Sequence, residues 1–212
     1  MRPDRIPLFP LNVVLFPGGD LPLHIFEPRY RAMVKDCLKQ KSEFGMLLAV
    51  DNGVARVGCT AEILKVAKRY EDGRMDIFTV GRAPFRVIDF YAENPLLEGI
   101  VDYLDDGEAL PELRTQQELT ELFEVCHTLI FDDYPRIAAD KRCKQPQHPS
   151  ALSYRVASTL PIDLLWKQQV LELRSERDRQ ERLVAYLREW APHLQKVKAF
   201  CKNSDGNGFG LN

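Results

Sequence analysis

The chain has 212 residues, 45% of them hydrophobic and 28% charged, which is typical of a globular protein and excludes wholesale disorder. The net charge is −2, and residues 1–105 and 106–212 each carry −1, so neither half has the positive excess of a dedicated nucleic-acid or anionic-membrane binder. No stretch reaches the roughly 20 apolar residues of a membrane span, and prolines break the N-terminal apolar run, unlike a signal peptide. We therefore expect a cytoplasmic protein.

The first hundred residues have the pattern of β structure. Short apolar runs alternate with turn residues, and the Asp72-Gly73 pair between two of the runs is the strongest hairpin signal in the chain. The strands predicted from these runs are residues 13–16, 21–25, 45–50, 59–70, 75–80, 84–90 and 96–104. Short strands at this close spacing predict a small barrel or a rolled sheet.

One helix is predicted among these strands. Pro28 stands at a favourable first helical position, and apolar side chains then recur at helical spacing: Tyr30, Met33, Val34, Cys37 and Leu38. We expect this stripe to face the sheet.

Apolar residues recur with helical period after Gly107. The signals for helix starts and ends predict helices over residues 111–131, after Ser150, after Pro161, and from Ser175 to a stop before Pro192. Residues 134–149 hold three prolines and predict a loop. The expected organisation is a β-rich subdomain, a helical bundle and a flexible tail, over residues 1–106, 107–200 and 201–212.

The five cysteines are odd in number, and no two have CxxC spacing. This predicts reduced, mostly buried thiols and not a disulfide framework or a four-ligand zinc site. Cys143 and His148 are five residues apart, but nothing near them completes a set of metal ligands. Cys126 and His127 are neighbours on a predicted helix and point about 100° apart, so they do not form a catalytic dyad. We expect Cys126 to be a packed thiol.

The sequence lacks the common catalytic motifs. It has no GxSxG turn, no HExxH helix and no GxxxxGK[ST] phosphate loop, and the glycine-rich run at residues 206–210 lacks the flanking strand and helix of a phosphate site. We therefore expect no catalytic residues, no metal and no cofactor, and a protein that is not an enzyme.

Six segments in order resemble one known family. They carry the paired "PLFPL" and "LFPG" elements, a strand-to-helix element, a "GT-x-A-x-I" strand, a "GxxRFRV" stretch, an "LP…KQ-x-LLE" pattern and a closing "RL" pair. In this chain they are Ile6–Gly18, Leu23–Arg31, Val57–Ile63, Val80–Val87, Leu160–Leu173 and Arg182-Leu183. Together they are similar to the N-terminal substrate-binding domain of Lon-type ATP-dependent proteases, in a stand-alone member.

The resemblance implies an α+β fold, in which a PUA-like β pseudo-barrel is followed by a C-terminal helical bundle. It also implies a non-catalytic module that binds polypeptides. Full Lon proteases continue with an ATPase domain and a Ser-Lys protease domain, neither of which we expect here, so ATP hydrolysis and proteolysis do not carry over. The expected partners are unfolded or exposed polypeptide segments, with a separate protease or chaperone as a further candidate.

The second of the six segments holds the candidate site. A polypeptide-binding rim would use the polar and aromatic side chains around the start of the predicted helix: His24, Phe26, Glu27, Arg29 and Tyr30. Structural roles for the same residues are open as alternatives. Glu27 would cap or favour the helix N-terminus, the arginine would be solvated or ion-paired, and His24 would be a structural or rim histidine.

RNA binding is the alternative function, because PUA domains proper bind RNA. Lys65, Lys68 and Arg69 precede Tyr70 on a predicted strand, which is a basic stretch beside an aromatic ring. A true RNA face would also need exposed stacking aromatics and surplus positive charge, and the charge of this half is balanced. Solvated edge-strand charge is the competing interpretation of this stretch.

Overall fold

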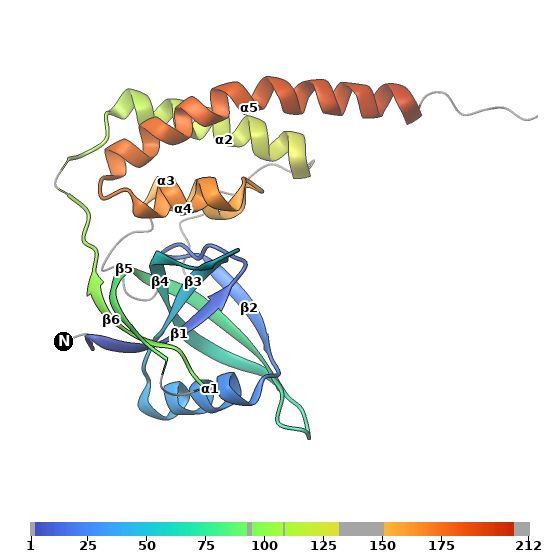
Figure 1. The fold of residues 1–212 in the computed structure, drawn as a ribbon. Helices are drawn as coiled ribbons and strands as arrows, with labels where there is room; N and C mark the ends of the chain where they lie inside the picture. The colour runs from blue at the N-terminus through green and yellow to red at the C-terminus, as the bar shows by residue number, and fades with distance from the viewer. Residues whose placement is uncertain (1–2, 93–94, 108, 132–150, 206–212) are drawn as a thin grey trace, which may run out of the picture. The chain divides into compact units, whose positions relative to one another are not determined.

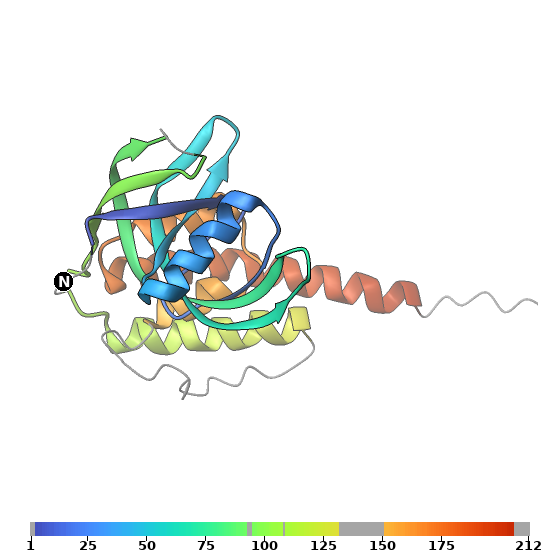
Figure 2. The same cartoon turned by 90° about the horizontal axis from the view of Figure 1, so that it is seen from below.

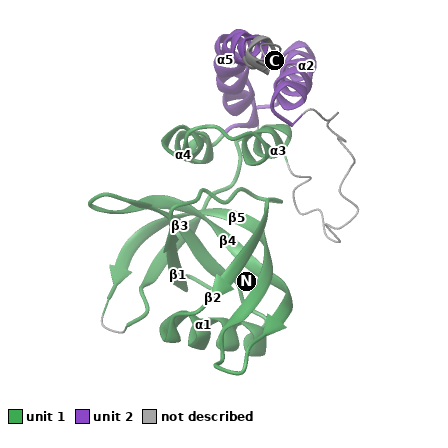
Figure 3. Ribbon diagram, turned by 90° about the vertical axis from the view of Figure 1, so that its right-hand side faces the viewer, with its two compact units in different colours: residues 1–107, 146–174 green, residues 108–145, 175–212 purple. Residues whose placement is uncertain are grey.

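The structure is a computed structural model that describes residues 3–92, 95–107, 109–131 and 151–205. It contains two compact units, one formed by residues 1–107 with 146–174 and the other by residues 108–145 with 175–212 (Figure 3). The loop predicted over residues 134–149, the Cys143–His148 pair in it and the glycine-rich run at 206–210 lie outside the described residues.

A mixed six-stranded sheet forms the body of the first unit. Its strands, labelled in Figure 1, are β1 (Arg5–Leu11), β2 (Asp20–Ile25), β3 (Phe44–Val50), β4 (Gly53–Arg69), β5 (Met75–Tyr91) and β6 (Glu98–Tyr103). Their order is β2-β5-β4-β3-β1-β6, and β6 also pairs with β5, so five strands close into a barrel while β2 remains at the end of the sheet. The predicted barrel and the α+β class are confirmed.

The long hairpin of β4 and β5 forms where the Asp72-Gly73 signal predicts it. Gly73 has a φ of +85°, a conformation that glycine adopts without strain. The two runs predicted over 75–80 and 84–90 are one strand, because the ladder contains a bulge between Cys59 and Ala61. The hydroxyl of Thr60 accepts the backbone N–H of Ala83 at 3.0 Å within this bulge. A chain that looks interrupted in sequence is therefore continuous in the sheet.

The strand predicted over residues 13–16 is wrong. Strand β1 covers residues 5–11 and includes Pro7 and Pro10, whereas residues 13–16 have no strand pairing although Val14, Leu15 and Phe16 are buried. Pro10 pairs only with β3 and Pro7 only with β6. Each proline therefore has one side on which no ladder hydrogen bond is required, which is where a strand tolerates it.

Helix α1 (Pro28–Gln40) covers one end of the barrel, as the view from below in Figure 2 shows. Its predicted apolar stripe faces the sheet: Tyr30, Met33, Val34 and Cys37 are buried, and Leu38 packs against the same core cluster. The helix ends at Lys41, which takes a left-handed conformation and returns its N–H to the carbonyl of Cys37. The predicted helix is confirmed.

Helices α3 (Leu152–Thr159) and α4 (Leu164–Glu172) belong to the barrel unit and not to a separate bundle. They share a core cluster with the barrel, in which Tyr154 and Val170 pack with Phe16 and Val57. The side-chain amide of Gln168 donates to the carbonyl of Val57 at 2.9 Å. This differs from the predicted boundary at residue 106, because apolar side chains, and not the order of elements along the chain, decide which core a helix joins.

The second unit is a pair of helices, α2 (Leu113–Phe131) and α5 (Glu176–Asp205), that pack against each other. Leu119, Phe123 and Cys126 of α2 and Leu183 and Leu187 of α5 are buried. Ion pairs join the helices, from Arg177 to Glu112 at 3.0 Å and from Arg188 to Glu118. The Oγ of Ser175 accepts the N–H of Asp178 at 3.3 Å, so the predicted restart at Ser175 is confirmed.

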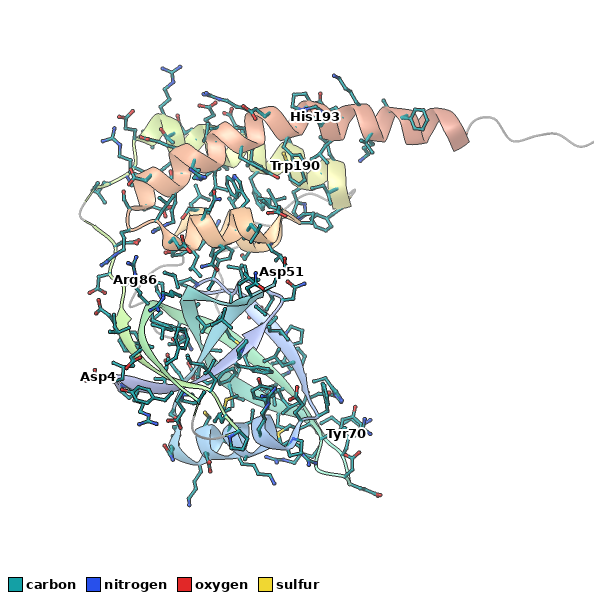
Figure 4. The ribbon with its side chains drawn as sticks, in the orientation of Figure 1. Asp4, Asp51, Tyr70, Arg86, Trp190 and His193 are labelled. Carbon is teal, nitrogen blue, oxygen red and sulfur yellow. The ribbon has the colours of Figure 1, made fainter. Side chains whose placement is uncertain are left out.

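The predicted helix stop before Pro192 is wrong. Helix α5 continues through this proline to Asp205, past Trp190 and His193, which are labelled in Figure 4. Proline removes the hydrogen bond to the carbonyl of Arg188, but both residues are exposed, so water can satisfy that carbonyl. The tail predicted from residue 201 is therefore helical as far as Asp205. None of the described helices has a stretch apolar enough and long enough to span a bilayer.

Candidate functional site

A surface pocket of about 390 Å³ lies in the barrel unit between the end of β1 and strand β2. We call it the β1–β2 pocket. It is lined by residues 9–11, 22–27, 29 and 30. All five residues of the predicted rim are among them: His24, Phe26, Glu27, Arg29 and Tyr30. The structure therefore brings the sequence-selected side chains together around one cavity.

The turn from β2 into α1 positions the rim. Ile25 ends the strand in the core, and Pro28 begins the helix three residues later, so Phe26 and Glu27 belong to neither element. The Phe26 side chain is left 59% exposed beside the pocket. Glu27 stands at the N-cap position with extended backbone, but its carboxylate makes no capping hydrogen bond. The local sequence thus places an exposed aromatic ring and a carboxylate that does not cap the helix at the pocket mouth.

Glu27 pairs with Arg29 instead. The Nε of Arg29 donates to Oε2 of Glu27 at 2.9 Å, and its second nitrogen lies 2.8 Å from the same oxygen. The Arg29 guanidinium also lies 4.5 Å above the centroid of the Tyr30 ring. The two charges at this rim therefore pair with each other.

An aromatic pair forms the floor of the pocket. The rings of Phe9 and Tyr30 stack with their centroids 4.0 Å apart, and both side chains are buried. Burial raises the pKa of the Tyr30 phenol above its ordinary value, and the nearby Arg29 charge opposes that rise. Tyr30 therefore stays neutral and offers an apolar surface with one polar end.

Asp76 of β5 forms hydrogen bonds with the side chains of His24 and Tyr70. Its carboxylate lies 2.6 Å from Nδ1 of His24 and accepts the Tyr70 hydroxyl at 2.9 Å. The hydrogen bond from His24, followed by that from Tyr70, holds the pKa of Asp76 below its ordinary value. The His24 ring also stacks near Phe26, at 6.2 Å between centroids. His24 is thus a rim histidine held in one orientation.

Sequence reasoning missed Phe9 and Asp76. Phe9 lies in the opening family-like segment, but the predicted strand begins at residue 13 and β1 begins at Arg5, so the prediction does not assign Phe9 to a face of the sheet. Asp76 stands opposite His24 in the β2–β5 ladder. That ladder joins strands about fifty residues apart, and only the alternation of β2, with Pro22 and His24 exposed and Leu23 and Ile25 buried, signals which residues share the outer face.

The basic stretch of β4 lies outside the pocket. Lys65 sits 4.7 Å over the Phe78 ring, Lys68 sits 4.5 Å over the Tyr70 ring, and Arg74 lies 5.1 Å from the centroid of Tyr70. Tyr70 lies near the turn of the β4–β5 hairpin (Figure 4). These aromatic faces are occupied by cations of the same chain, so they are not open to a stacking base. RNA binding here stays a prediction without a supporting contact.

The candidates for chemistry outside the pocket are packed side chains. Burial raises the pKa of the Cys126 thiol to about 11, which suppresses the reactive thiolate. His127 packs against the rings of Phe123 and Phe131. Cys37 and Cys59 are buried free thiols. Within the described ranges, no three His, Cys, Asp or Glu side chains gather closely enough to hold a metal ion.

Comparison with known families and proteins gives one consistent result. The model of the "ATP-dependent protease La (LON) substrate-binding domain" matches residues 5–189. The chain is 28% identical over 181 residues to the Lon protease of Anaeromyxobacter dehalogenans and 29% identical to Lon protease 2 of Myxococcus xanthus. These alignments cover 80% of this chain and 21% and 22% of the two relatives. The chain thus spans about a fifth of the length of the Lon proteases it matches.

Solved structures agree with the family match. A Lon N-terminal domain protein from Xanthomonas campestris aligns with a TM-score of 0.67 and 27% identity, covering 86% of this chain and 98% of that one. The N-terminal domain of the Mycobacterium avium complex Lon protease aligns with a TM-score of 0.60, covering 86% of this chain and 97% of that one. At 16% identity, this second likeness shows the fold alone.

Proposed function

The chain belongs to the LON substrate-binding domain family, and from that premise we propose that it binds exposed polypeptide segments, without catalysing a reaction, at the β1–β2 pocket. The observation that carries the proposal is the pocket itself. It joins an aromatic floor of Phe9 and Tyr30 to a rim on which Phe26 is exposed to solvent.

The chemistry of the pocket suits an uncharged ligand. The Glu27–Arg29 and His24–Asp76 pairs satisfy the charged groups around it, so a charged side chain entering the pocket would find no free partner. An apolar side chain would instead cover Phe26 and the edge of Tyr30 and remove their apolar surface from water. Unfolded or misfolded chains expose such side chains, which folded proteins bury.

The same side chains argue against catalysis. A nucleophilic site needs a nucleophile, a base and a donor for the developing charge in one place. The pocket lining contains no cysteine, serine or threonine, and its one histidine is hydrogen-bonded to Asp76 outside the pocket. ATP hydrolysis and proteolysis belong to the full Lon proteases and form no part of the proposal.

Capture of a segment by this module would serve a partner that acts on the bound chain. We propose a separate protease or a chaperone in the cytoplasm for that role, and the match to a protease substrate-binding domain supports it. The pocket would supply recognition, and the partner would supply the chemistry.

Titration of the ¹⁵N-labelled protein with reduced, carboxymethylated ribonuclease A, a permanently unfolded chain, tests the proposal. We expect NMR shift changes at residues 22–30 and a weaker affinity, by about tenfold, for Phe26→Ser, because one large apolar contact is lost. Ile88→Ser is the matched control, since Ile88 is 55% exposed on β5 and does not line the pocket. Absence of shifts with the unfolded chain, or equal effects of the two variants, would refute the proposal.

A further inference from the structure

Two strand edges border the β1–β2 pocket. Within the described residues, β2 pairs only with β5, so its other edge has no strand partner. Strand β1 pairs with β6 over residues 5–7 and the N–H of Leu8 donates to the carbonyl of Leu97, but over residues 9–11 β1 pairs with β3 alone among the described strands. The unpaired part of β1 and the unpaired edge of β2 both contribute to the lining of the pocket.

The edge of β1 is poor in hydrogen-bonding groups. Pro10 has no N–H, and the carbonyl of Leu11 already accepts the N–H of Val13 at 2.8 Å. The edge of β2 is therefore the one with backbone groups to offer.

Three observations fix which backbone groups of β2 point away from the sheet. The hydroxyl of Thr79 on β5 donates to the carbonyl of Leu21 at 2.7 Å, so position 21 faces β5. Groups alternate along a strand, and positions 22 and 24 therefore face outward. Pro22, which cannot donate to a neighbouring strand, stands at one of these outward positions, as edge prolines do.

The third observation is the contact between His24 and Asp76. These residues are directly opposite in the antiparallel ladder, and their side chains approach to 2.6 Å. Opposite side chains come closest in pairs that do not exchange backbone hydrogen bonds. The N–H and C=O of His24 and the C=O of Pro22 are thus directed to the open edge, beside the pocket.

We infer that the β1–β2 pocket holds its polypeptide in extended form, as a strand added to the open edge of β2, with one apolar side chain of that strand in the pocket. The inference rests on the proposed function and specifies its ligand. The backbone of the added segment exchanges hydrogen bonds with His24 and donates to the carbonyl of Pro22, and its apolar side chain packs against Phe26 and Tyr30.

The edge selects an extended segment over a helix. A helix has satisfied its own backbone groups and has none to offer to a strand edge, whereas an extended chain presents an N–H and a C=O at every second residue. The Glu27–Arg29 ion pair and the His24–Asp76 hydrogen bond occupy the polar groups of the rim, which favours a neutral, apolar side chain. Pro22 also disfavours a second copy of β2 as the occupant. Proline has no N–H, so two paired β2 edges would lose a backbone hydrogen bond at each Pro22.

Binding of a fluorescent decapeptide with alternating threonine and valine and a central phenylalanine tests the inference. In a series of single N-methylations along this peptide, we expect the affinity to fall about five- to tenfold at every second position near the phenylalanine and to stay unchanged at the positions between. An added strand directs only alternate N–H groups to β2. Losses without a two-residue period would overturn the inference.

Substitution of His24 provides the complementary test from the protein side. His24→Ala removes the imidazole and keeps the backbone N–H, whereas His24→Pro removes both, so the inference predicts that the proline variant binds the decapeptide five- to tenfold more weakly than the alanine variant. Equal affinities of the two variants, each with a cooperative thermal transition, would contradict it. If the proline variant does not fold, the N-methylated series decides alone.

The outcomes separate this inference from the function on which it rests. Binding of the unfolded ribonuclease that is weakened by Phe26→Ser, together with a flat N-methylation series, would retain the polypeptide-binding function and reject strand addition. Failure of the unfolded chain to bind would reject both. Binding of both probes with the two-residue period would support both.

Discussion

The closed wall of the barrel and the open edge at β2 differ in the solvent exposure of an aromatic residue. On the closed wall, Phe85 of β5 is completely buried in a cluster with Leu8 and Leu47. At the open edge, Phe26 follows β2 and is 59% exposed. Phe85 is buried because its side chain packs in a core cluster inside the barrel, and Phe26 is exposed because it lies in the turn between β2 and α1 and packs in neither element.

The family-like segments divide between these two regions. Gly58, Thr60 and Gly81 lie within the closed wall, where close backbone approach and the Thr60 hydrogen bond hold the strands together. The segment from Leu23 to Arg31 lines the pocket. A shared motif therefore does not by itself indicate a shared function, because most of the likeness preserves the barrel, and only this segment and residues 9–11 of the opening one line the cavity.

Truncation of the two phenylalanines gives the largest expected contrast. Phe85→Ala should lower the free energy of unfolding by about 3–5 kcal/mol, because it leaves a cavity in a fully packed site. Phe26→Ala should change it by about 0.5 kcal/mol or less, since an exposed ring loses little on truncation. Urea denaturation of both variants measures the difference, and similar losses would mean that the edge is not open in solution.

Adding one methyl group to the wall should have an intermediate effect. A Cβ on Gly58 would lie 2.2 Å from the carbonyl oxygen of Met46, so Gly58→Ala must displace backbone and should cost about 1–3 kcal/mol. Gly107→Ala is the control, because its Cβ would approach only the carbonyl of Arg174, at 3.4 Å. Thermal melts compare the two, and an equal decrease in Tm would contradict the close packing of β4 against β3.

Removing the charge of Asp76 should have the smallest effect, confined to the open edge. The pKa of Asp76 is lowered in the folded protein, so its carboxylate stabilises the fold above the ordinary pKa of 3.8, and this contribution is lost as the pH falls through the folded value. Asp76→Asn should therefore lower Tm slightly at pH 7, and by less as the pH falls below 3.8. Melts across this range test it, and a difference that does not change with pH would exclude the charge as its cause.

The elements that could be predicted from sequence are those fixed by neighbouring residues. The Asp72-Gly73 turn, the Pro28 start of α1 and the Ser175 cap are each decided within a few residues, and each is where the sequence predicts it. The predictions that are wrong depend on residues far away in the sequence. Pro7, Pro10 and Pro192 are read as breaks because proline lacks an N–H, and whether that N–H is needed depends on neighbours that the sequence does not place.

The candidate site was predictable in part for the same reason. His24, Phe26, Glu27, Arg29 and Tyr30 are within seven residues of one another, so any strand-to-helix turn gathers them, and the resemblance drew attention to that turn. Phe9 reaches the pocket, and Asp76 reaches His24, through the ladders of β1 and β5. A change of one residue in either register would turn those side chains to the other face.

By itself, the sequence determined the family-like segments, the α+β class, the local turns and the helix that contributes Arg29 and Tyr30 to the pocket. Only the tertiary structure decided that α3 and α4 join the core of the barrel, that β2 keeps one edge unpaired, and that Asp76 stands opposite His24. Local elements follow from backbone preferences over a few residues. Strand order, register and the sharing of a core follow from contacts between distant segments, which form only when the whole chain has packed.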